Sequence, residues 1–153
     1  ANGKYIFIQY ADLEYDHFKS LVMLKHAQEF KIDVVFASRL LKFSGSEIIK
    51  ELFKKPSYLA TIICTFLINF FYNKNLTDII GTKLYNKHAV APFIPKTNGQ
   101  GFDFEFVSII CKNKFKIDEL QINYIPRLNS KDKKIKFYHM FNALYAILKI
   151  KIK

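Results

Sequence analysis

The chain has 153 residues, half of them hydrophobic, so it can bury the core of one domain and does not have the composition of a disordered segment. Its 24 Lys and Arg residues against 13 Asp and Glu residues give a formal charge of +11, which favours anionic partners such as phosphates, nucleic acid or lipid headgroups. Cys64 and Cys111 both lie in apolar runs. This placement argues against a disulfide framework or a cysteine metal site and predicts two reduced core thiols.

Two short β-branched and aromatic runs near the N-terminus predict buried strands, at residues 5–9 and 34–37. The first run leads to Asp12 and the second to Arg39. Ligands bind at the carboxyl ends of strands in open α/β sheets, so we expect both side chains at one rim of a sheet.

Helices are predicted around and after these strands. Asp16 can cap a helix that ends near Phe30 and has apolar residues at three-residue spacing, namely Phe18, Leu21, Leu24 and Ala27. Ser44 and Glu47 fit a capping box that opens a helix, which Pro56 would interrupt. The uncharged run 57–72 is shorter than the roughly 20 residues of a spanning helix, so it predicts a buried or interfacial helix, with a membrane-dipping element as the alternative.

The second half predicts a helix, a strand and a final helix. The helix covers residues 102–111 and carries Asp103 and Glu105 near its N-terminal end, where acids suit the helix dipole. Residues 120–124 alternate between apolar and polar, as in a half-buried strand. After a basic loop, the last helix is amphipathic, with one stripe formed by Phe137, Phe141, Leu144, Tyr145 and Leu148.

The first of three separated segments that resemble one known family runs from Gly3 to Asp16 (GKYIFIQYADLEYD). It is similar to the strand of family 2 glycosyltransferases, of the dolichyl- and undecaprenyl-phosphate type, that leads into an Asp-Ala-Asp metal motif. Ala-Ser-Arg at 37–39 follows where the family has Gly-Ser-Arg. Tyr10 stands where the family has its first Asp, and a neutral phenol is a poor ligand for a hard divalent cation.

The other two segments come in the family's order and at similar spacing. Asn-Leu-Thr-Asp at 75–78, followed by Lys-Leu-Tyr at 83–85, resembles the family's Leu-Thr-Asp segment. Gly-Phe-Asp-Phe-Glu at 101–105, Ile-Asn-Tyr-Ile-Pro-Arg at 122–127 and Lys-Lys-Ile at 133–135 resemble the acceptor loop and its flanks.

The resemblance implies an α/β fold of the GT-A type, a Rossmann-like mixed sheet flanked by helices. Residues 1–153 would form a single partial domain that lacks the N-terminal nucleotide-binding strands, which we expect upstream of Ala1. The implied activity is inverting transfer of a sugar from a nucleotide-diphosphate donor to a polyprenyl phosphate, in cell-envelope or glycan biosynthesis. The implied location is cytoplasmic, at the inner face of the membrane. Without the upstream strands, the strand at 5–9 would be an exposed sheet edge and an aggregation liability.

The resemblance also implies site residues on the donor side. Asp12 would hold Mg²⁺ or Mn²⁺ with help from Glu14, because a divalent cation neutralises the charge that develops on the leaving diphosphate. The alternative is a solvated acidic turn. Arg39 and Asp78 would line the donor and acceptor pocket, since a guanidinium can bind a phosphate through two hydrogen bonds. The alternative for Arg39 is an ordinary surface arginine.

On the acceptor side, Arg127, Lys133 and Lys134 would bind the lipid phosphate, unless they are only a solvated charge run. A phosphate acceptor is already anionic, so a strong general base is optional. If the acceptor were a sugar hydroxyl, Asp103 or Glu105 would be the first candidates for the base, and otherwise they are helix N-terminal acids.

Two other functions remain open. A degenerate or truncated paralogue without catalysis, which binds membrane or a partner, is favoured by Tyr10. A nucleic-acid-binding domain would fit the charge, but the sequence has no recognised binding motif and no aromatic platform interleaved with basic residues. We therefore expect no nucleic acid among the partners.

Overall fold

The chain folds as a mixed α/β domain around a four-stranded sheet. The computed structural model describes residues 2–10, 14–54, 57–91, 93, 101–125 and 139–152. In chain order its elements are β1 (Tyr5–Ile8), α1 (Lys19–Glu29), β2 (Val34–Ser38), α2 (Gly45–Lys54), α3 (Ser57–Tyr72), β3 (Lys83–Asn86), α4 (Lys87–Val90), α5 (Phe102–Lys112), β4 (Ile117–Gln121) and α6 (His139–Ile152).

The strands lie in the order β1-β3-β2-β4. β3 is antiparallel to both β1 and β2, while β4 is parallel to β2, with Val35 opposite Asp118. Strands β1, β2 and β4 therefore run in one direction. Their last residues, Ile8, Ser38 and Gln121, lie with the first residue of β3, Lys83, at one edge of the sheet, which we call the carboxyl edge.

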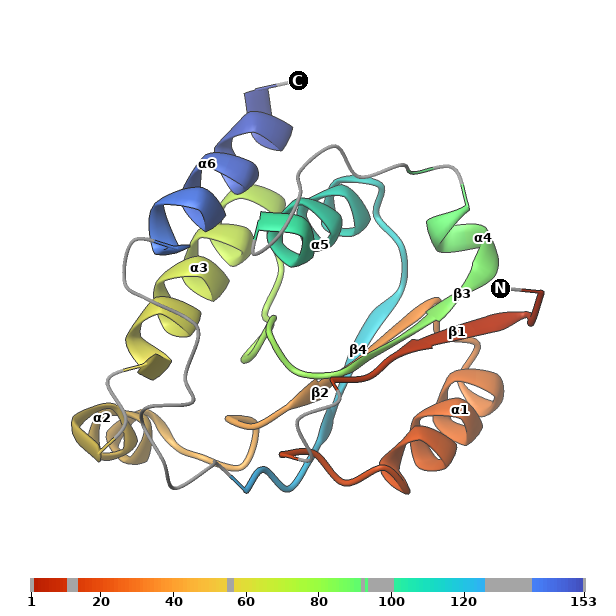
Figure 1. The fold of residues 1–153 in the computed structure, drawn as a ribbon, viewed down its shortest axis with the longest axis horizontal. Coiled ribbons are helices and arrows are strands. Elements are labelled where there is room, and N and C mark those ends of the chain that lie inside the picture. The colour runs from red at the N-terminus through yellow and green to blue at the C-terminus, as the bar shows by residue number, and fades with distance from the viewer. Residues whose placement is uncertain are drawn as a thin grey trace.

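Helices cover both faces of the sheet. Val34 and Phe36 of the fully buried β2 belong to a core shared with α3, α5 and α6, whereas Val35 and Ala37 belong to a second core under α1. Figure 1 shows these layers, with α1 on one side of the strands and α3, α5 and α6 on the other. The continuous apolar run of β2 follows from burial on both faces.

The strands at 5–9 and 34–37 and the helix at 102–111 are confirmed by β1, β2 and α5. The predicted strand at 120–124 is wrong in its bounds, because β4 spans Ile117–Gln121 and Tyr124 makes only an isolated bridge to Tyr15. Two consecutive acids, Asp118 and Glu119, interrupt the alternating pattern that would have predicted this strand. Both acids have partners in the fold: His26 Nε2 lies 2.7 Å from Asp118 Oδ2, and the Thr77 N–H donates to Glu119 Oε2. Elements β3 and α4 had no counterpart in the sequence analysis.

Two predicted apolar stripes face the core only in part: Leu24 and Ala27 of the first and Leu144 of the second pack on it. Phe18, directly before α1, and Leu21 of α1 are exposed, whereas Met23 and Ala27 are buried. In α6, Phe141, Tyr145 and Leu148 are exposed, and the helix packs on the core through Ala143, Ala146 and Ile147. Small side chains allow two helices to approach closely, so the alanine face of α6, not its bulkier stripe, lies against α5.

Local signals set several helix ends. The Ser44 N–H donates to Glu47 Oε2 over 2.7 Å, which is half of a capping box at the start of α2. Helices α2 and α3 lie on either side of Pro56, as predicted. Asp16 caps the turn before α1, where its Oδ1 accepts from the Phe18 N–H over 3.0 Å. No helix within the described ranges has the length and apolarity needed to cross a membrane.

Among the described residues, three with side chains have positive φ, namely Lys31 (51°), Asn73 (51°) and Lys114 (58°). They follow the ends of α1, α3 and α5, respectively. Each therefore ends a helix in the left-handed conformation that glycine usually provides.

Candidate functional site at the carboxyl edge of the sheet

A buried ion pair between Arg39 and Asp78 lies at the carboxyl edge. The Arg39 Nε donates to Asp78 Oδ2 over 2.6 Å, and Nη2 donates to Oδ1 over 3.0 Å. The backbone N–H of Arg39 also donates to Oδ2, over 3.1 Å. Asp78 is 0% exposed and Arg39 is 8% exposed. The Nε and Nη2 groups of Arg39, which together could bind a phosphate, are therefore already bonded to a carboxylate of the protein.

The end of β2 places Arg39 by a turn built on Ser38. The Ser38 Oγ accepts from the N–H groups of Leu40 and Leu41 over 3.1 and 3.0 Å, which turns the chain directly after the strand. The same Oγ lies 2.6 Å from Thr77 Oγ1. Ser38 thus fixes both the turn that carries Arg39 and the segment that carries Asp78.

Segment 77–82 packs closely against β2. The Ala37 N–H donates to the Thr82 carbonyl over 2.9 Å, and the Ile80 N–H donates to Asp78 Oδ1 over 3.0 Å. A Cβ atom on Gly81 would lie 1.8 Å from the carbonyl oxygen of Ala37. Only glycine allows the backbone at position 81 to lie this close to β2. This close packing keeps Asp78, in the same segment, next to Arg39.

Glu119 of β4 anchors the same segment from the other side. Its Oε2 accepts from the Thr77 N–H over 2.7 Å and from Thr77 Oγ1 over 3.0 Å, and its Oε1 accepts from the Asp78 N–H over 3.0 Å. Glu119 was not among the predicted site residues, since nothing in the pattern of β4 indicates a partner about forty positions away.

Burial and charge act in opposite directions on these groups. Burial alone would lower the pKa of Arg39, but the charge and hydrogen bonds of Asp78 outweigh it and raise the pKa above its ordinary value. Burial would raise the pKa of Asp78, but Arg39 lowers it below its ordinary value. Burial raises the pKa of Glu119, and its backbone hydrogen bonds offset this only in part. The pair is therefore an ionised guanidinium and carboxylate at neutral pH.

Aromatic rings surround the guanidinium of Arg39. Its Cζ lies 5.1 Å from the ring centre of Tyr58 on α3 and 5.2 Å from that of Tyr124. The Tyr124 hydroxyl donates to Glu14 Oε2 over 2.9 Å. The bridge between Tyr15 and Tyr124 brings Glu14 next to Tyr124. The residue predicted to assist the metal therefore lies beside the rings that pack on Arg39.

A second polar group lies at the same edge. The Tyr10 hydroxyl donates to Asp103 Oδ2 across from α5. The buried Lys83 ammonium lies 3.2 Å from Asp103 Oδ1 and 3.0 Å from the Gly81 carbonyl. Burial, with Asp103, raises the pKa of Tyr10 far above its ordinary value, so this phenol stays neutral and donates. Tyr15 lies between the two groups, with its ring centre 6.0 Å from that of Tyr10 and 5.3 Å from that of Tyr124.

The predicted site residues divide into three groups. Arg39, Asp78, Asp103 and Glu14 lie at the carboxyl edge. Glu105 is 3% exposed within α5. Asp12, Arg127, Lys133 and Lys134 lie outside the described residues. Lys83, Tyr58 and Tyr124 were not among the predicted residues; Lys83 and Tyr124 fall in segments of the family resemblance, which was the available signal.

The described residues supply one of the two predicted cation ligands. Glu14 is 9% exposed, and its carboxylate has the oxygen chemistry that Mg²⁺ and Mn²⁺ prefer. Within the described ranges, no three His, Cys, Asp or Glu side chains are grouped so that they could hold a metal ion. The fit of a cation therefore depends on Asp12 joining Glu14.

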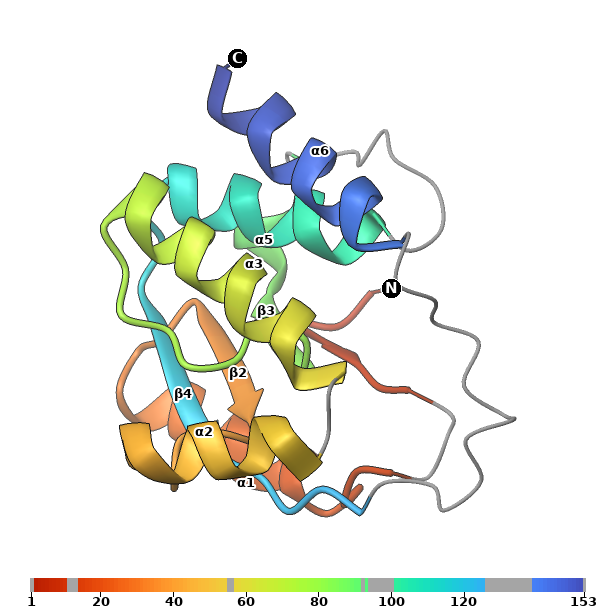
Figure 2. The same cartoon turned by 90° about the vertical axis from the view of Figure 1, so that its left-hand side faces the viewer.

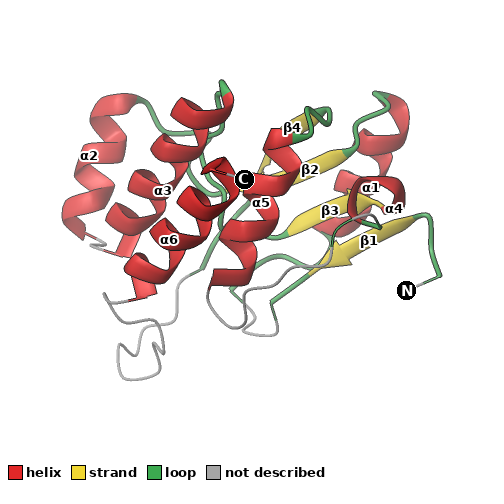
Figure 3. Cartoon of the chain, turned by 90° about the horizontal axis from the view of Figure 1, so that it is seen from above, coloured by secondary structure: helices red, strands yellow, loops and turns green. Residues whose placement is uncertain are grey.

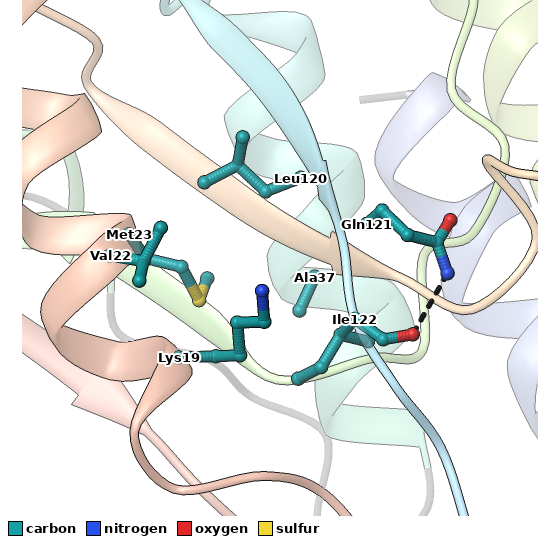
Figure 4. A pocket seen from close by; sticks show the side chains of 7 residues that line it. All are labelled: Lys19, Val22, Met23, Ala37, Leu120, Gln121 and Ile122. Atoms are coloured by element: carbon teal, nitrogen blue, oxygen red, sulfur yellow. Dashed lines mark hydrogen bonds between the residues drawn. The ribbon is translucent and has the colours of Figure 1, made fainter.

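A cavity of about 250 Å³ lies on the α1 side of the sheet. Figure 4 shows its lining of mainly apolar side chains from α1, β2, β4 and Ile122 directly after β4, with the Lys19 amine directed toward the space between helix and strands. None of the predicted site residues that the structure describes lines this cavity. Gln121 at the carboxyl edge is among the lining residues, so the cavity borders that edge without contacting the Arg39–Asp78 or Tyr10–Asp103 groups.

Comparison with known proteins identified no relative of the chain: no family model, no curated protein and no solved structure matches it.

Proposed function

We propose that the chain is the acceptor-side part of a GT-A family 2 glycosyltransferase. One observation carries the proposal: all three segments of the resemblance meet at the carboxyl edge, the first through Tyr10 and Arg39, the second through Asp78 and the third through Asp103. Ligands bind at this edge in open α/β sheets. The mixed sheet, with three strands in one direction, supports the finer assignment to GT-A.

The proposed reaction moves a sugar from a nucleotide-diphosphate donor to a polyprenyl phosphate. An acceptor phosphate oxygen attacks the anomeric carbon, the bond from that carbon to the donor diphosphate breaks, and the nucleoside diphosphate leaves with the electron pair. Attack from the opposite side inverts the configuration. Because the acceptor is already an anion, no proton has to be removed first.

In this proposal the chain's charged residues have distinct roles. Asp12 and Glu14 hold Mg²⁺ or Mn²⁺, which neutralises the charge on the leaving diphosphate when bound. The buried Arg39–Asp78 pair supports the wall of the proposed donor and acceptor pocket, with the rings of Tyr58 and Tyr124 packed on its guanidinium beside Glu14. Arg127, Lys133 and Lys134 bind the acceptor phosphate, and the protein works at the cytoplasmic face of the membrane as a peripheral protein.

The direct test measures transfer from labelled nucleotide-diphosphate sugars to a polyprenyl phosphate by the full-length protein. Asp12→Ala is expected to lower the rate on the order of a hundredfold or more, because the cation contributes several kcal/mol to stabilising the transition state. Asp16→Ala, an exposed acid in the same region, is the matched control and should retain activity. Equal rates for Asp12→Ala and the unchanged protein would contradict the cation role.

A second candidate is a non-catalytic paralogue, and one contact favours it. The Tyr10 side chain takes the place of a family carboxylate, stays neutral, and donates to Asp103. Tyr10→Asp separates the two functions: transfer that appears only in this variant assigns the chain to the non-catalytic class. Transfer by the unchanged protein rules that class out.

A further inference from the structure

Helices α3 and α6 carry apolar side chains that face away from the protein. On α3, Leu59, Phe66 and Phe70 are exposed, and their spacing of seven and four places them on one side of the helix. On α6, Tyr145, Leu148 and Ile152 are exposed at spacings of three and four, with Ile152 84% exposed. We call these six residues the outer apolar face.

The two helices expose this face on one side of the molecule. Cys64 and Ile68 of α3 and Ala143 and Ile147 of α6 all belong to the same core, and α3 packs against α6. Their opposite sides therefore point away from a common core. Figure 2 shows both helices on the side that faces the viewer, and Figure 3 shows them away from the strands.

Lysines border the outer apolar face, and acids are absent from both helices. The sequences 57–72 and 139–152 contain no Asp or Glu. The Lys149 amine lies 5.6 Å from the ring centre of Tyr145, and the Lys151 amine donates to the Phe71 carbonyl over 2.9 Å. An apolar surface bordered by cations complements a layer of anionic headgroups above acyl chains.

We propose that the outer apolar face docks on an anionic lipid bilayer, with α3 and α6 lying in the interface. The inference names a surface for the peripheral association in the proposed function, and to that extent rests on it. Lysine borders would repel each other if two copies met at this face, and the chain's net charge of +11 adds to that repulsion. A bilayer with negative headgroups has the opposite charge.

The test measures binding to vesicles of phosphatidylcholine with and without phosphatidylglycerol. Phe66→Ser with Leu148→Ser is expected to lower the partition coefficient on anionic vesicles at least about tenfold, since exposed apolar area provides the binding. The control is Phe18→Ser with Leu21→Ser, which removes a phenylalanine and a leucine that are even more exposed, at the start of α1 on the other face of the sheet. This control should bind as the unchanged protein does.

A tryptophan reporter gives an answer even if the serine variants fold poorly. The chain has no tryptophan, so Phe66→Trp and Phe18→Trp each introduce a single fluorophore. We expect a blue shift on adding anionic vesicles for Phe66→Trp and none for Phe18→Trp. Equal shifts, no shift at position 66, or equal binding of both serine pairs would overturn the docking surface.

Two further measurements separate other outcomes. A dimer in vesicle-free buffer that Phe66→Ser makes monomeric would identify the face as a contact between copies and overturn membrane docking. Transfer to a short polyprenyl phosphate in detergent needs no bilayer, so the face variants should keep that activity. If vesicle binding fails while transfer persists, the docking proposal is wrong and the proposed function stands.

Discussion

Gly81 lies at the closest approach between the segment that carries Asp78 and strand β2. Gly81→Ala would bring a Cβ to 1.8 Å from the Ala37 carbonyl oxygen, so the backbone must shift. We expect a loss of about 1–3 kcal/mol in the free energy of unfolding, measured by urea denaturation.

Gly45 provides the control for this change, because a Cβ there meets nothing within 4 Å at the start of α2. Gly45→Ala should be neutral or stabilise by up to about 1 kcal/mol. If Gly81→Ala has the same small effect, segment 77–82 is not held against β2 as described.

Because of Asp78, the free energy of unfolding should fall as the pH is lowered into the acid range. Its folded pKa is below its ordinary value of 3.8, so its stabilisation is complete above pH 3.8 and is lost as the pH falls through the folded pKa. Asp78→Asn leaves Arg39 without a charged partner and should cost about 3–5 kcal/mol at pH 7.

The difference in unfolding free energy between the unchanged protein and Asp78→Asn should shrink below pH 3.8, as urea titrations in that range would measure. Asp16→Asn removes the same charge from an exposed side chain and serves as the control. A difference that stays constant with pH would mean that the ionised carboxylate of Asp78 does not stabilise the fold.

At the scale of elements, the orientation of α6 decides which of its residues stabilise the fold. Ile147 is 0% exposed, whereas Leu148 is 43% exposed. Ile147→Ala should cost about 2–5 kcal/mol because it leaves a cavity in the core. Leu148→Ala should change the free energy of unfolding by no more than about 0.5 kcal/mol. Thermal or urea denaturation of both variants would measure this, and the reverse order would restore the stripe predicted from the sequence.

Sequence patterns predicted the elements whose side chains are buried among other apolar residues. Strand β2 is buried on both faces and reads as a continuous apolar run. Strand β3 begins with Lys83, whose burial depends on the carbonyl of Gly81 and the carboxylate of Asp103. Those partners come from other segments, so no local pattern could have indicated this strand.

The candidate site was predictable only where the family resemblance named its residues. Arg39 and Asp78 were predicted together, but their mutual hydrogen bonds follow from the close packing of segment 77–82 on β2. Glu119 was not predicted, because the alternation of a strand indicates only the face of the sheet on which a side chain lies. It does not indicate that the carboxylate will accept hydrogen bonds from the N–H groups of Thr77 and Asp78.

At the scale of the whole molecule, the two cysteines report on global unfolding. Cys64 of α3 and Cys111 of α5 are both buried in the core shared with β2 and α6. Burial raises the pKa of Cys64 to about 11 and that of Cys111 to about 12. Both thiols are therefore protonated and inaccessible in the native state.

We expect Ellman's reagent at pH 8 to label both thiols at least about a thousandfold more slowly in the folded than in the unfolded protein. The labelling rate should rise with urea in parallel with the unfolding equilibrium. Fast labelling of one cysteine in native buffer would show that its helix opens independently of the rest.

The residues with positive φ after α1, α3 and α5 include positions at which a substitution could raise the stability of the fold. Lys31 and Lys114 adopt backbone conformations that are strained for a residue with a side chain, and glycine would relieve that strain. Both lie on the surface, away from the carboxyl edge. Glycine at Lys31 or Lys114 could therefore offset the stability lost when charges are removed from the carboxyl edge, so that other effects of those removals can be measured on a folded protein.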